Sequence, residues 1–148
     1  MEKKISFLCL FVLLTMSNMI SAQDKKVEKS IVSPTATIKK YHDLKELQDM
    51  KKGELLDLYI ERINVLVKTL PYIALATKPG VTFSDLGIPN DNDNKKALIE
   101  QDKSTIDFLE VTVAFQKRMT PYSDTKNLIA AILFYENTLK ALHEFNEM

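Results

Sequence analysis

The segment Leu55–Ala76, LLDLYIERINVLVKTLPYIALA, decides the fold of this chain. Its apolar residues recur at intervals of three, four and seven, which is the spacing of one face of an α-helix. That stripe consists of Leu55, Leu56, Tyr59, Ile60, Ile63, Leu66, Val67 and Leu70. Pro71 lacks an amide hydrogen, so we expect the helix to kink or restart there.

A second apolar line follows the same segment at a spacing of seven, through Leu58, Val65 and Tyr72. Two apolar lines on one helix predict contact with at least two neighbours. Those neighbours are either other helices of a bundle, which is the more common arrangement, or a separate partner protein.

The first 22 residues have the pattern of a signal peptide. Lys3 and Lys4 precede the apolar run Ile5–Met16, and Ser21-Ala22 offers small residues for cleavage. The apolar run has about twelve residues, whereas a membrane-spanning helix needs roughly twenty. We therefore expect export and cleavage, a periplasmic or secreted location, and no stable membrane span afterwards.

Composition excludes several classes of function. The chain has 148 residues, with 20 basic and 20 acidic side chains and no basic block. This balance argues against nucleic acid as a ligand and against an anionic membrane surface. Cys9 is the only cysteine and lies in the expected signal peptide. The remaining chain thus has no disulfide, thiol nucleophile or cysteine metal ligand.

Beyond the signal peptide, we expect a flexible tether over residues 23–40 and a helical domain over residues 41–148. The tether mixes charge, Ser, Thr and Pro without periodicity. The domain begins with a short helix over residues 41–52, where Asp43 and Glu46 form a candidate capping box. A long connection, residues 78–94, follows the central helix, and long connections are often binding loops.

Two more long helices are expected, over residues 93–119 and 122–145, with a stop and restart at Thr120-Pro121. Beside the main apolar face of the first lies a bulky line, Phe108, Phe115 and Met119. The second contains eight consecutive apolar residues, Leu128–Tyr135, which predicts a helix that is buried centrally or covered by a partner.

The segments 56–72 and 106–122 also align weakly, and both end in Pro-Tyr. No segment alternates like a strand, so the predicted fold is all-α, a small bundle of three long helices and one short one.

The residues that carry chemistry are sparse and scattered. His42 and His143 are the only histidines, and no local motif of a hydrolase, zinc protease or phosphate loop is present. The run 90–94, NDNDN, suggests calcium, but Lys95 would occupy a ligand position, so helix capping is favoured. Asp102 and Glu136 lie on or beside apolar faces and are expected to be hydrogen-bonded acids rather than catalytic ones.

These observations favour a non-enzymatic exported protein with no catalytic, metal-binding or cofactor-binding residues. It would act as an envelope interaction or accessory protein, and its partner would be another envelope protein or a second copy. The candidate interaction surface comprises Leu58, Val65, Tyr72, Phe83, Leu86 and Ile88. The alternatives are a carrier of a small apolar ligand or of non-covalent haem, with Met50 and His143 as the conceivable axial pair, and a small hydrolase around His143.

Overall fold

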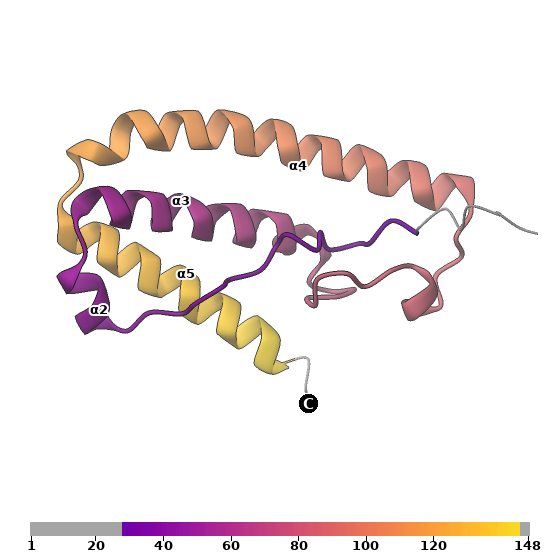
Figure 1. Ribbon diagram of the computed structural model, residues 1–148. Helices are drawn as coiled ribbons and strands as arrows, with labels where there is room; N and C mark the ends of the chain where they lie inside the picture. The colour runs from indigo at the N-terminus through magenta and orange to yellow at the C-terminus, as the bar shows by residue number, and fades with distance from the viewer. Residues whose placement is uncertain (1–27, 146–148) are drawn as a thin grey trace, which may run out of the picture.

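The computed structural model describes residues 28–145, and within that range it is helical with no strand. Its helices are α2 (Leu44–Asp49), α3 (Lys52–Thr69), α4 (Asn92–Met119) and α5 (Thr125–Phe145) (Figure 1). Three short 3₁₀ turns join them, at Leu70–Tyr72, Ser84–Leu86 and Thr120–Tyr122. The all-α prediction, with three long helices and one short one, is confirmed. The expected signal peptide, residues 1–22, lies outside the described residues.

The helix boundaries follow local chemistry that the sequence shows. Asp43 caps α2 by accepting from the backbone N–H of Glu46, and the Glu46 carboxylate accepts from the N–H of Asp43. Asp91 caps α4 by accepting from the backbone N–H of Asn94, as expected for the polar run 90–94. Thr82 donates to the Asp85 carboxylate, and the short turn that this begins ends at Gly87 with a φ of 68°.

The central helix stops at its proline. We expected the segment Leu55–Ala76 to kink or restart at Pro71, and α3 ends at Thr69 with a 3₁₀ turn over Leu70–Tyr72. α4 ends the same way, in a 3₁₀ turn over Thr120–Tyr122. In both turns proline occupies the start, where its missing N–H costs no intrahelical hydrogen bond. The aligned Pro-Tyr pairs therefore share a local structure.

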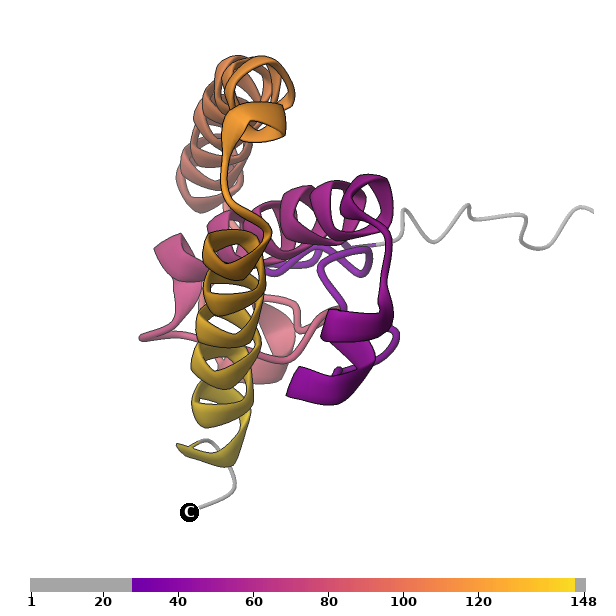
Figure 2. The same ribbon diagram turned by 90° about the vertical axis from the view of Figure 1, so that its left-hand side faces the viewer.

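α3 is the element on which the others pack. α4 runs along one side of it and α5 along another, while α5 diverges from α4 (Figures 1 and 2). Two buried clusters lie along α3 and α5. One comprises Leu47, Leu55, Ile129 and Ile132, and the other Val65, Leu66 and Leu139.

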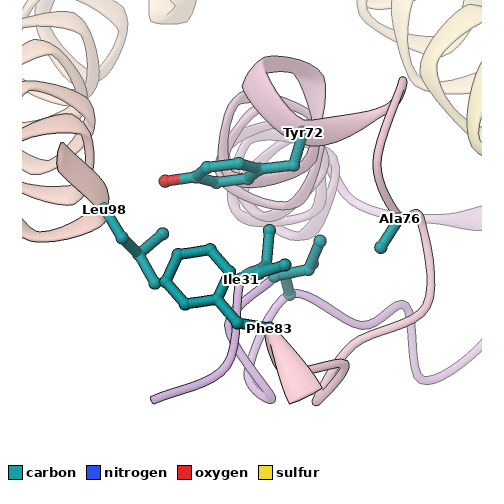
Figure 3. Close-up of a cluster of buried hydrophobic side chains, with 7 residues drawn as sticks. Ile31, Tyr72, Ala76, Phe83 and Leu98 are labelled. Atoms are coloured by element: carbon teal, nitrogen blue, oxygen red, sulfur yellow. The ribbon is translucent and has the colours of Figure 1, made fainter. Parts of the chain in front are cut away.

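A third buried cluster includes residues that were expected to be a flexible tether. Ile31, Val32 and Ala36 are buried with Tyr72, Ala76, Phe83 and Leu98 (Figure 3). Residues 28–42, which we call the N-terminal strap, are not helical and contain a turn at Pro34-Thr35, and Ser30 forms an isolated antiparallel bridge with Thr82. The tether prediction is wrong for residues 28–40, because apolar side chains there fill a gap between α4 and the 70–88 region. Residues 23–27 lie outside the described range.

The apolar run Leu128–Tyr135 does not make α5 a central helix. Leu128, Ile129 and Ile132 are buried, but Phe134 projects into solvent with 64% of its surface exposed. One face of α5 thus packs on α2 and α3, while Phe134 on another face is not covered by any part of residues 28–145. Among residues 28–145, no helix combines the length and apolarity that a bilayer span requires.

Candidate functional site

The most prominent exposed feature is a row of large apolar side chains along the second half of α4 and the 3₁₀ turn that follows it. We call it the α4 row. Its members and their exposed fractions are Phe108 57%, Val111 72%, Phe115 58%, Met119 47% and Tyr122 87%. The spacing of three and four residues places them on one side of the helix. Single exposed apolar residues are ordinary on protein surfaces, but a contiguous row of this size marks an interaction site.

α4 presents this row because it is covered on one side only. Leu98, Thr105 and Leu109 are its buried residues, and they occupy the face toward α3 and the strap. From residue 110 to the end of the helix at Met119, no side chain is fully buried. A helix of 28 residues that buries three side chains leaves most of its apolar surface available for another molecule.

The candidate interaction surface expected from sequence is not a surface. Val65, Tyr72 and Phe83 are buried, and Leu58 and Ile88 are half-buried against core clusters. Leu86 alone is exposed. These residues fall into different clusters rather than on one face. The bundle-core alternative is therefore the right explanation of the Leu58, Val65 and Tyr72 line.

The sequence does show the bulky line of Phe108, Phe115 and Met119, but it does not mark the line as exposed. Apolar residues at helical spacing look the same whether another part of the chain or another molecule covers them. The signal that would mark the line as exposed is that no other apolar segment packs on it. This is visible only in the structure, where α5 diverges from α4 (Figure 2).

A buried charged cluster lies on the other side of α3, among Arg62, Glu136 and His42. Arg62 and Glu136 are each 1% exposed. Arg62 donates to Glu136 Oε1 through Nε at 2.9 Å and through Nη2 at 2.6 Å. The backbone N–H of His42 donates to Glu136 Oε2 at 2.7 Å, and His42 Nδ1 lies 3.1 Å from Oε1. Arg62 Nη2 also donates to the carbonyl oxygen of Lys40 at 2.6 Å.

The environment keeps this carboxylate ionised. Burial raises the pKa of Glu136, but hydrogen bonds from His42 and Arg62, together with the guanidinium charge, outweigh burial and hold that pKa below its usual value of 4.5. Every oxygen of the carboxylate has a partner in the protein. The cluster thus joins the strap, α3 and α5 as a structural clamp, in line with the expectation of a hydrogen-bonded acid.

Asp102 is the second acid expected to be hydrogen-bonded, and it too has partners. It accepts from the Tyr72 hydroxyl at 2.6 Å and forms an ion pair with Lys29 of the strap. In Figure 3 the Tyr72 hydroxyl points out of the apolar cluster toward α4. Burial and this hydrogen bond to a carboxylate raise the pKa of Tyr72. These contacts hold the strap and the end of α3 to the first half of α4.

The geometry separates the residues of the haem alternative. Met50 packs against the cluster that contains Ile129 and Ile132. His143 lies 14 residues beyond Ile129 on α5, or about 21 Å along the helix axis. Axial ligands sit on opposite sides of one iron atom, so Met50 and His143 do not form an axial pair. Within residues 28–145, no group of three or more His, Cys, Asp or Glu side chains is placed to hold a metal ion.

Shallow hollows also mark the surface. One, of about 470 Å³, lies between α2 and the start of α5, lined in part by Leu44, Ile129 and Leu133. Another, of about 320 Å³, lies where the strap meets α3 and α4, beside Lys68 and Asp102.

No protein-family model, curated protein or solved structure matches the chain. Function is therefore inferred from the site alone.

Proposed function

We propose that this protein is a non-enzymatic interaction protein of the cell envelope, which binds a protein partner through the α4 row. The observation that carries the proposal is the exposure of Phe108, Val111, Phe115, Met119 and Tyr122 on one side of a helix whose other side packs on α3. Aromatic residues and methionine are enriched at the cores of protein interfaces. The compartment in this proposal is inferred from the sequence of residues 1–22.

The shape of the row supports a protein partner in this proposal rather than a small molecule. The row is convex and runs along a straight helix, whereas small-molecule sites are concave and enclose their ligand. An amphipathic helix face recognises another helix or a groove through anchors at intervals of three and four residues. Val111 belongs to the row and is 72% exposed, so a change there alters the surface without disturbing the core.

The test is capture of partners from the native envelope by immobilised protein in three forms: wild type, Val111→Glu and Lys103→Glu. Lys103 is exposed on α4 and lies outside the row, so Lys103→Glu introduces the same side chain elsewhere on the same helix. We expect wild type and Lys103→Glu to retain one protein in stoichiometric amount. Val111→Glu should retain about 100-fold less, because a charge at the centre of an interface costs several kcal/mol.

The result that would overturn the proposal is equal retention by all three forms. Circular dichroism of each form before capture excludes unfolding as the cause of a loss. A second row variant, Phe115→Lys, should behave as Val111→Glu does, since Phe115 is also exposed.

A further inference from the structure

α4 has two apolar faces, of which only one has a neighbour among residues 28–145. Leu98, Thr105 and Leu109 form the face on α3, and the α4 row forms the other. At about 100° per residue, the two faces lie roughly 95° apart around the helix axis. A helix of a four-helix bundle has neighbours on two such faces. α3 is one neighbour of α4, and the second position is open.

Building on the proposed function, we propose that the second neighbour is α4 of another copy of this chain. The two α4 helices pack antiparallel about a two-fold axis that passes near Val111 and Thr112. A two-fold contact requires a surface that is complementary to itself. In this register Phe108 lies against Phe115 of the partner subunit, and the reverse pair repeats on the other side of the axis. Met119 then meets Ser104 of the partner subunit, so a large side chain faces a small one.

Charge selects the antiparallel arrangement. Asp107 and Arg118 are exposed and lie within about 20° of each other around the axis of α4, on one flank of the row. In a two-fold antiparallel pair each flank meets the same flank of the partner subunit. Asp107 of one copy therefore comes within one helical turn of Arg118 of the partner subunit, twice per dimer. A parallel two-fold pair would bring this flank against the opposite flank of the partner subunit, which carries the uncharged Thr112 and Gln116, so the opposite charges would not meet.

The exposed area of the row suits a dimer. At roughly 150–250 Å² for a whole aromatic side chain, and less for Val111 and Met119, the exposed part of the row amounts to about 600 Å². A standard interface buries about 800 Å² on each partner. Ser104, Asp107 and Arg118 at the edges of the row supply the remainder. An isolated row of this size fits a reversible dimer better than a permanent one.

The experiment is sedimentation equilibrium of the purified protein over a wide concentration range. Wild type is expected to be a monomer–dimer equilibrium, and Val111→Glu should raise the dissociation constant about 100-fold. Asp107→Arg alone and Arg118→Glu alone should each weaken the dimer about tenfold, since each creates two like-charge contacts. The double variant, with both changes, restores opposite charges and should return to within about threefold of wild type.

Each alternative result has a definite meaning. A protein that stays monomeric at several hundred micromolar overturns the dimer, and so does a dimer that Val111→Glu leaves intact. A double variant as weak as its two parents combined overturns the antiparallel register. If wild type is monomeric while Val111→Glu still loses a captured protein, the partner is a different protein and the proposed function survives. If Val111→Glu alters neither dimerisation nor capture, both proposals fail.

Discussion

At the scale of single residues, Glu136 has the most contacts that join distant parts of the chain. Its carboxylate receives hydrogen bonds from Arg62 on α3 and from His42 on the strap, which lie 74 and 94 residues away in sequence. A buried ion pair is not in itself a strong source of stability, because both groups lose their hydration. Removing one partner of a buried ion pair costs more stability than the intact pair provides, because the remaining partner stays buried and charged.

Replacing this carboxylate should destabilise the fold markedly. Glu136→Gln keeps the size of the side chain but leaves the Arg62 guanidinium buried without its counter-charge, and we expect a loss of about 3 kcal/mol in the free energy of unfolding at pH 7. Urea denaturation followed by circular dichroism measures it. Glu100→Gln is the matched control, because Glu100 is exposed and pairs only with Lys96 at 3.9 Å. It should change stability by less than about 0.5 kcal/mol.

A comparison of Glu136→Gln with wild type also tests the pKa of Glu136. That pKa is lower in the folded protein than the ordinary value of 4.5. The carboxylate therefore makes its full contribution to the free energy of unfolding above about pH 4.5. It is lost as the pH falls through the lower, folded-state pKa. Between pH 7 and pH 3, Glu136→Gln should therefore lose less of its free energy of unfolding than wild type loses. Equal losses in the two proteins would show that the site does not depend on ionisation.

At the scale of elements, the strap is the segment whose structure departs most from expectation. Ile31 and Val32 are 1% and 0% exposed, and the backbone of Ile31 donates to the carbonyl of Val81 at 2.7 Å. A non-helical segment that runs across helices needs only a few apolar side chains at irregular spacing to be held. It therefore has the same composition as a tether.

Truncating one of those side chains should show whether the strap contributes to stability. Ile31→Ala removes a buried side chain from a packed cluster, and we expect the free energy of unfolding to fall by about 2–4 kcal/mol. Thr37→Ala, at an exposed position of the strap, is the control and should change it by less than about 0.5 kcal/mol. A strap that were free in solution would make the two variants equivalent in thermal and chemical denaturation.

Prediction from sequence succeeded where the determining interactions are local. The cap at Asp43, the cap at Asp91 and the stop at Pro121 depend on residues three or four positions apart, and each lies where the pattern indicates. The burial of Val65 and the exposure of Phe115 are set by which elements meet in space. Both residues lie in apolar lines at helical spacing, and only the divergence of α5 from α4 distinguishes them (Figure 2).

At the scale of the whole molecule, the core consists of three separate clusters around α3 rather than one continuous interior. α3 and α5 share two of them, while α4 contributes Leu98 to the third. The second half of α4, residues 110–119, has no fully buried side chain, so we expect it to be held less tightly than the first half. Stability is thus unevenly distributed over the four described helices.

Hydrogen exchange should make this unevenness visible. In Val111→Glu, where the α4 row has no partner, backbone amides of residues 110–119 should exchange at least about tenfold faster than those of residues 62–69 in α3. The reason is that opening the second half of α4 exposes little buried apolar surface. Mass spectrometry of exchanged peptides measures the difference. Equal protection of the two segments would contradict the idea that α4 is held through its first half.

The position of the strap also has a consequence for the order of events during synthesis. A chain emerges from the ribosome with its N-terminus first, so the strap is made before every surface on which it docks. Phe83 is synthesised 52 residues after Ile31, and Glu136 follows His42 by 94 residues. The nascent chain therefore carries Ile31 and Val32 without a complete docking site until Leu98 has been made. The contact between His42 and Glu136 closes only when α5 has been completed, which makes the first described segment of the chain the last to find its place.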